Sequence, residues 1–243
     1  MSPLRRIALV GGALYLVTFI ASIPAVFFLS PVLDNADYIV SSGADTRVVF
    51  GGLLDVVNAL ACIGTAIVLF PVVKRQNESL ALGFVASRVL EAAVILVGVV
   101  SLLAVVTLRQ DLGASAGADT ASLVTTGQAL VAVRDWTLLL GPGLMAGVNA
   151  ALLGTLMYRS GLVPRIIPTM GLIGAPILLV SCIATLFGVH DQFSPSALLL
   201  VLPVAAWELS LGVWLVVKGF KPSPITAAGV PPDLPTREAL PIA

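Results

Sequence analysis

Charge is scarce in this sequence. Only 11% of the 243 residues are Asp, Glu, Lys or Arg, whereas soluble domains carry roughly 25%. The 13 acidic residues equal the 13 basic ones, so no basic excess points to nucleic acid. Hydrophobic residues make up 58% of the chain, and the mean hydropathy is +1.06. This composition excludes a soluble globular domain and indicates an integral membrane protein whose main partner is the lipid bilayer.

Residues that bind metals or cofactors are also few. The chain has one histidine, His190, and two cysteines, Cys62 and Cys182, which both fall in apolar runs and form no CxxC pair. A disulfide framework or a zinc site is therefore not expected, and the cysteines are interpreted as small packing residues. No nucleotide-binding loop, GxSxG elbow or HExxH helix is found. The sequence predicts neither a metal nor a cofactor.

Long apolar runs are abundant, and six of them reach the ~20 residues that a membrane-spanning helix needs. They cover residues 7–29, 48–73, 80–108, 125–158, 166–188 and 197–217. The first run is longer than the apolar region of a signal peptide, which favours an uncleaved helix. The fourth run is too long for one straight span, and Gly141-Pro142-Gly143 predicts a kink or break in it. The expected fold is an all-α polytopic bundle of six transmembrane helices.

The distribution of Lys and Arg predicts the orientation of the bundle, because cytoplasmic loops carry the excess of these residues. One set of flanking segments holds Arg47 and Arg109 only. The opposite set holds nine basic residues: Arg5, Arg6, Lys74, Arg75, Arg159, Arg165, Lys218, Lys221 and Arg237. Both termini of this multi-pass membrane protein are therefore expected in the cytoplasm.

The apolar runs and the composition of the C-terminal segment divide the chain into two regions. Residues 1–221 are expected to form the six-helix transmembrane domain. Residues 222–243 are Pro-rich and lack apolar periodicity, so a disordered cytoplasmic tail is predicted there.

Six ionisable side chains fall inside the predicted spans, where each costs about 2.5–3.5 kcal/mol at a helix centre. They are Asp55, Arg88, Glu91, Arg134, Asp135 and Glu208. Because unpaired charges facing lipid would be costly, we expect these side chains to face inward and to meet in one polar cluster. Arg88 and Glu91 are three residues apart on one helix face and can form an ion pair.

Two further residues are assigned to the predicted site. Asn58 lies three residues after Asp55 and extends its polar face, and Trp207 precedes Glu208 deep in the last span. Arg134 and Asp135 are neighbours about 100° apart around a helix, so they should contact different partners. The segments "VNALACIGTAIVLFPVVKR" and "VNAALLGTLMYRSGLVPR" are similar, which indicates either a duplicated helical hairpin or a chance likeness of two Ala/Leu/Gly-rich helices.

The predicted cluster contains four carboxyls and two guanidiniums, a net charge of −2 if all are ionised. Arginine keeps its proton in proteins, so either carboxyls hold protons or a cation lies among them. Glu208 is the first candidate for a protonatable group, because no basic residue lies within one turn of it. This favours binding or transport of a small or lipid-like ligand, coupled to a proton or cation. Two alternatives remain: an intramembrane enzyme with Glu91, Glu208 or Asp135 as general base, and a structural subunit whose charges hold helices together.

Three segments resemble one known family. They are "LFPVVKRQNESLALGFVASRVLEA", "VRDWTLLLGPGLMAGVNAALLGTLMYRSGLVPRIIPTMGLIGAPILL" and "PVAAWELSLGVWLVVKGF". Over roughly residues 6–220 the chain is similar to the bacterial membrane proteins grouped as domain of unknown function 4386. The resemblance implies a polytopic inner-membrane protein and supplies no catalytic residues. Neither the ligand nor the oligomeric state follows from the sequence.

Overall fold

The computed structural model describes residues 1–41, 43–112 and 120–227. In this part of the chain the elements are α1 (Pro3–Leu33), the short 3₁₀ helix η1 (Tyr38–Val40), α2 (Asp45–Val73), α3 (Glu78–Leu112), α4 (Thr120–Leu138), the π-helical η2 (Leu139–Met145), α5 (Ala146–Ser160), α6 (Ile166–Leu186), α7 (Pro195–Val217) and α8 (Pro224–Ala227). Within these ranges the chain contains no strand, and six helical segments are long and apolar enough to cross a membrane. The predicted all-α, six-span fold is confirmed.

The fourth span is continuous from Thr120 to Ser160 and is the longest of the six at 41 residues. The break expected at Gly141-Pro142-Gly143 takes the form of a π-helical stretch, Leu139–Met145, between α4 and α5. Pro142 lacks a backbone N–H and so cannot continue the α-helical hydrogen bonding, and a π-helical turn accommodates it without ending the span.

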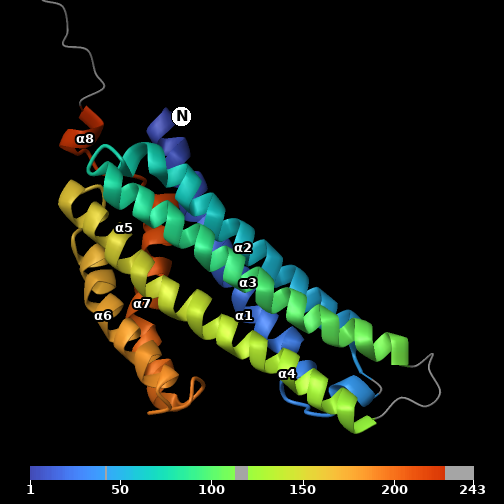
Figure 1. The fold of residues 1–243 in the computed structure, drawn as a ribbon. Helices are drawn as coiled ribbons and strands as arrows, with labels where there is room; N and C mark the ends of the chain where they lie inside the picture. Colours follow the sequence, from blue (N-terminus) through green and yellow to red (C-terminus); the bar gives the residue numbers. More distant parts are fainter. Residues whose placement is uncertain (42, 113–119, 228–243) are drawn as a thin grey trace, which may run out of the picture.

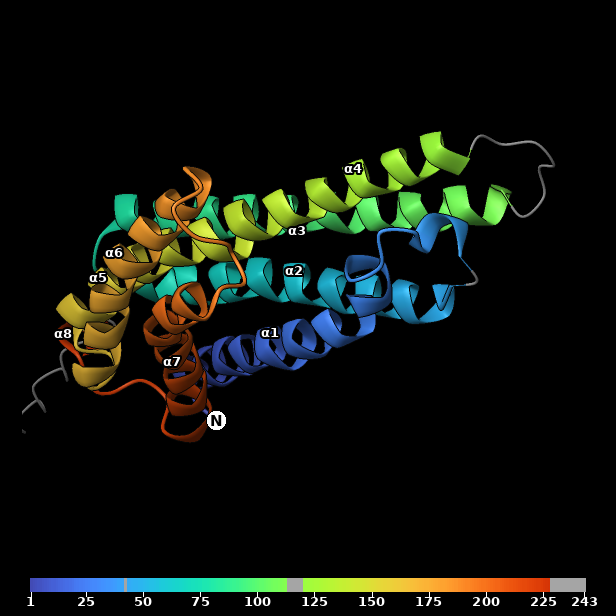
Figure 2. The same ribbon diagram turned by 90° about the horizontal axis from the view of Figure 1, so that it is seen from below.

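The six spans form a closed ring. Each packs beside its neighbour in sequence, and α7 packs against α1 to close the ring. Because the number of spans is even, the N-terminus and α8 lie at the same end (Figure 1). Helices α6 and α7 are inclined to α1–α3 and pack beside α5, away from the end at which α4 begins (Figure 2). Within the described residues, the end of the bundle at which α4 begins is built from α1, α2, α3, α4 and η1.

Local sequence signals set the helix ends. Ser2 caps α1, with its side chain accepting the backbone N–H of Arg5, and proline follows at the first helical position. Ser194 caps α7 in the same way, accepting from the N–H of Ala197. Helix α5 ends at Gly161, whose φ of 65° lies in the left-handed region that glycine favours.

Two glycines allow α1 and α7 to approach closely. A Cβ at Gly12 would lie 2.7 Å from the carbonyl oxygen of Gly212 and 2.9 Å from the backbone nitrogen of Val216. These are backbone atoms that cannot rotate away as a side chain can. The close approach of α1 and α7 therefore requires that residue 12 lack a side chain.

Gly12→Ala is expected to destabilise the protein by about 1–3 kcal/mol, because the added methyl group forces the two helices apart. The matched control is Gly52→Ala on α2, where a Cβ would lie 3.5 Å from a valine side chain, an ordinary contact. Thermal unfolding of the purified variants in detergent measures both. Equal stability of the two variants would contradict the close packing of α1 on α7.

The predicted tail starts later than its sequence suggests. From Pro222 to Ala227 the chain stays on the bundle: Ser223 is buried, its hydroxyl donates to the carbonyl of Ser160 over 2.5 Å, and Arg75 donates to the carbonyl of Ile225. This segment was predicted as disordered, and it instead ends in the short helix α8. The remainder, residues 228–243, lies outside the described residues.

Candidate functional site

Arg88, on α3, lies at the centre of a buried cluster of polar side chains. Its Nη1 donates to Oε2 of Glu91 over 3.0 Å, and its Nη2 donates to Oε1 of Glu208 on α7 over 2.5 Å. The side-chain amide of Asn149, on α5, donates to the same Glu91 oxygen over 2.7 Å. The intrahelical pair predicted from the spacing of Arg88 and Glu91 is present. We call Arg88, Glu91 and Glu208 the triad.

The triad is unevenly exposed. Arg88 and Glu91 are 2% and 4% exposed, whereas the side chain of Glu208 is 15% exposed. Glu208 is therefore the most exposed member of the triad. It is also the member contributed by a different helix, so its ion pair with Arg88 joins α7 to α3.

Aromatic and sulfur groups surround the guanidinium. The Arg88 Cζ lies 5.1 Å from the ring centroid of Tyr15 on α1 and 5.9 Å from that of Phe84 on its own helix. Its Nη1 lies 3.6 Å from Sγ of Cys62 on α2. The negative faces of the rings stabilise the cation in a site with little water. Arg88 thus contacts side chains from α1, α2, α3 and α7.

Two buried polar atoms beside Glu91 form no hydrogen bond with the described part of the chain. They are Nε of Arg88, a donor, and Oδ1 of Asn149, an acceptor. Both belong to side chains that bond to Glu91, so Arg88 has one unused donor and the neighbouring Asn149 has one unused acceptor. Most buried polar groups in folded proteins are paired, and these two atoms have no partner within the described residues.

A second ion pair joins α2 to α4. Arg134 Nη2 donates to Oδ2 of Asp55 over 2.9 Å, and both residues are buried. Gly98 on α3 makes room for this pair, since a Cβ there would lie 2.9 Å from Cδ of Arg134 and would meet Thr137. The pair carries no net charge.

The six ionisable residues therefore do not meet in the single cluster expected from the sequence. They form the triad, the Asp55–Arg134 pair, and a separate Asp135. On α2, Asp55 and Cys62 are seven residues apart, which places the pair and the triad about 10 Å apart along the helix. If all are ionised, the net charge of −2 is divided equally between the triad and Asp135.

The other two predicted site residues take different positions. Asn58 is buried on α2 and accepts a weak hydrogen bond from the thiol of Cys62 over 3.9 Å, so it lies next to the triad. Trp207 is 1% exposed and packs on α6, where a Cβ at Gly171 would lie 2.7 Å from the indole ring. Trp207 thus lies in the apolar core between α6 and α7.

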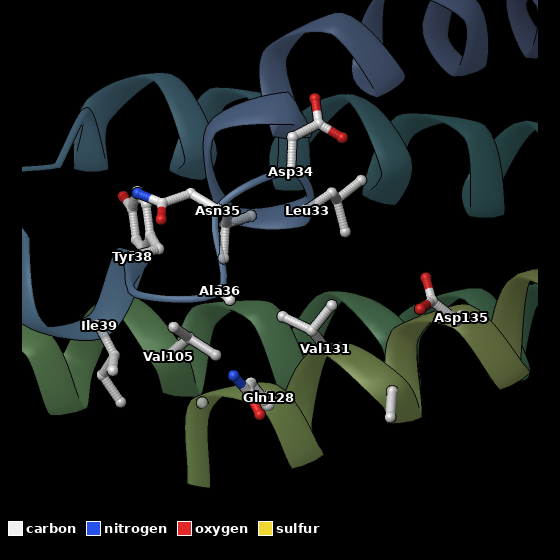
Figure 3. A pocket seen from close by; sticks show the side chains of 13 residues that line it. Leu33, Asp34, Asn35, Ala36, Tyr38, Ile39, Val105, Gln128, Val131 and Asp135 are labelled. Carbon is white, nitrogen blue, oxygen red and sulfur yellow. The ribbon is translucent and has the colours of Figure 1, made fainter. Parts of the chain in front are cut away.

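Asp135 lines a cavity of about 320 Å³ at the end of the bundle where α4 begins (Figure 3). We call it the outer cavity. Asp34, from the end of α1, supplies a second carboxylate, and Asn35 and Gln128 supply amides. Val105 and Val131 are among the apolar residues between them, and none of the residues that line the cavity is basic. Arg134 pairs with Asp55, whereas its neighbour Asp135 lies on the wall of this cavity.

A polar cluster closes the same end of the bundle. Arg109 Nη1 pairs with Asp45 over 2.5 Å, its Nε donates to the carbonyl of Ser41, and Tyr38 donates its hydroxyl to Asp45 over 2.9 Å. Burial raises the pKa of the Tyr38 hydroxyl, and its bond to the Asp45 carboxylate raises it further. Tyr38 therefore stays neutral and donates this hydrogen bond throughout the physiological pH range. The cluster ties the loop before α2 to the end of α3.

Four residues around the triad escaped prediction: Tyr15, Cys62, Phe84 and Asn149. The signal for Asn149 was in the repeated Val-Asn-Ala of α2 and α5, because its counterpart Asn58 also lies beside the triad. Tyr15, Cys62 and Phe84 have no such signal, since aromatic and small residues are common in any apolar helix. Within the described ranges, no group of three or more His, Cys, Asp or Glu side chains could hold a metal ion.

Six apolar spans and buried ion pairs between them define a polytopic integral membrane protein with a polar interior. The chain belongs to the family described as Domain of unknown function (DUF4386), which it matches over residues 10–219. This confirms the resemblance seen in the sequence. Neither the curated proteins nor the solved structures give a match. The family description names no activity.

Proposed function

We propose that this protein binds or transports a small ligand across or within a bacterial inner membrane, and that the triad couples this step to a proton or a small cation. One observation carries the proposal: a single guanidinium faces two carboxylates from two helices. With all three groups ionised, the triad has a net charge of −1 in a site shielded from water. One proton or one monovalent cation neutralises it.

Neutralisation has a mechanical consequence at Glu208. When this carboxylate is charged, it holds α7 against Arg88 on α3 over a 2.5 Å contact. When it is neutral, the charge-assisted bond weakens and Arg88 keeps only Glu91, on its own helix. The packing of α7 on the rest of the bundle then has two states that differ in charge. A ligand that binds one of them better shifts the population between them.

The outer cavity supports a ligand of particular chemistry. It combines the two carboxylates of Asp34 and Asp135 with apolar walls and has no basic lining residue. An organic cation with an apolar body fits this combination. Asp135 adjoins Arg134 in the chain, so α4 connects the cavity to the Asp55–Arg134 pair, and α2 continues from that pair to Cys62 beside the triad.

The proposed orientation places both termini in the cytoplasm. The asymmetry of nine basic residues against two supports it, and the even number of spans places both described ends together. In this orientation the outer cavity opens away from the cytoplasm and the triad lies deep between the two surfaces.

Glu208→Gln tests the proposed role of the triad, because glutamine preserves shape and can still accept a hydrogen bond from Arg88. Infrared difference spectra of the reconstituted protein, recorded between alkaline and acidic buffer, should show a carboxyl group taking up a proton. We expect this signal to disappear in Glu208→Gln and to persist in Glu78→Gln, a change at an exposed acid in the first turn of α3.

Native mass spectrometry of the same three proteins reports any small molecule retained on purification. A retained ligand that is lost with Glu208→Gln supports the proposal. A spectrum that Glu208→Gln leaves unchanged would refute the coupling role, and the triad would then serve only to hold α7 in place.

A further inference from the structure

A basic cavity lies between the start of α1 and the segment that follows α7. It has a volume of about 310 Å³. Its polar lining consists of three cations, Arg5, Lys218 and Lys221, and the hydroxyls of Ser2 and Thr226, with no acidic residue among the residues that line it. We call it the basic cavity. It lies at the opposite end of the bundle from the outer cavity and is independent of the triad.

The fold holds the basic cavity in shape. Arg5 donates from Nη1 to the carbonyl of Leu215 over 2.8 Å and from Nη2 to that of Val216 over 2.6 Å, so its guanidinium is fixed at the end of α7. Gly219, at a φ of 76°, turns the chain back. Lys221 then donates its N–H to the carbonyl of Leu162 over 2.7 Å. The two lysines therefore lie on an anchored turn.

We propose that the basic cavity binds the phosphate headgroup of an anionic phospholipid. Arg5 bonds to carbonyl oxygens, and no acidic residue lines the cavity beside it or the two lysines. Three such cations attract a phosphate, and basic pockets at the ends of membrane helices recognise such headgroups.

Apolar surface beside the cavity favours a lipid over a free phosphate. Val10 on α1 and Val213 and Val217 on α7 are 45%, 45% and 61% exposed. They lie within about two to three turns of the basic side chains, on the two helices that Gly12 and Gly212 bring together. Acyl chains that leave a headgroup in the cavity would lie along this surface. This proposal does not depend on the function assigned to the triad.

Native mass spectrometry of the full-length protein in detergent tests the site, with phosphatidylglycerol and phosphatidylcholine of equal chain length as probes. Wild type should retain phosphatidylglycerol preferentially. Lys218→Gln/Lys221→Gln should weaken this binding about thirtyfold, since each lysine near a membrane surface contributes roughly fivefold. Binding of phosphatidylcholine should not change.

The control is Lys74→Gln/Arg159→Gln, which removes the same charge from exposed residues at the same end of the bundle that do not line the basic cavity. It should alter phosphatidylglycerol binding by less than about twofold. Equal losses in the two double variants would overturn the site and leave only general attraction to basic residues. Displacement of the lipid by inorganic phosphate at comparable concentration would overturn the lipid assignment in favour of free phosphate.

Discussion

Arg88→Leu should destabilise the folded protein by about 3–5 kcal/mol, because it leaves the buried carboxylate of Glu91 and the partly buried carboxylate of Glu208 with no cation between them. Glu91 and Glu208 both bond to the Arg88 guanidinium, which also contacts Tyr15 and Cys62. Through these contacts Arg88 connects α1, α2, α3 and α7. Thermal unfolding in detergent measures the loss of stability, with the fraction of protein that remains monodisperse as the readout.

Removing the charges of the two carboxylates should reverse most of this effect. In Arg88→Leu/Glu91→Gln/Glu208→Gln the site is neutral and its amides can bond to one another and to Asn149. Arg159→Leu, at an exposed position on α5, is the control for losing an arginine and should change stability by less than about 0.5 kcal/mol. Arg88→Leu protein as stable as wild type would show that the triad does not hold the bundle together.

Arg134→Leu should have an effect of similar size, about 3–5 kcal/mol, because Asp55 is then buried without a partner. Asp55→Asn should partly restore stability when combined with Arg134→Leu, although it destabilises the protein alone. The four unfolding curves form a double-mutant cycle, and a coupling energy near zero would contradict the pair.

The same measurements test whether the triad and the pair are separate. Residues more than about 7–10 Å apart with no shared partner have additive effects within ~0.5 kcal/mol. Glu208→Gln and Asp55→Asn should therefore add when combined. A larger deviation would indicate one connected network, as the sequence first suggested.

Features that depend on a single helix could be predicted from the sequence. Each span is found because ~20 apolar residues are needed to cross a bilayer wherever the helix packs. The Arg88–Glu91 pair is found because both residues lie on α3 and their spacing alone puts them on one face. The position of the irregular turn in the fourth span followed from Pro142 for the same reason, although its π-helical form did not.

Features that depend on how two helices pack together could not be predicted from the sequence. The Asp55–Arg134 and Arg88–Glu208 contacts require the rotation and depth of one helix against another, and apolar residues on every side of a membrane helix leave that rotation undetermined. The cost of unpaired charges facing lipid favours one cluster, whereas the packing of Arg134 beside Gly98 directs it toward α2 and leaves Asp135 on the wall of the outer cavity. The basic cavity was missed because part of it comes from the segment predicted to be disordered.

The distribution of the ion pairs along the chain bears on how the protein is made. Helices emerge from the ribosome in order, and α3 brings Arg88 together with Glu91, so this helix can insert with its charges already matched. Asp55 enters earlier on α2 and finds Arg134 only after α4 has followed, while Glu208 arrives with the last span. Biogenesis thus leaves α2 with an unmatched charge for the time it takes to synthesise two more helices, and the final helix completes the assembly.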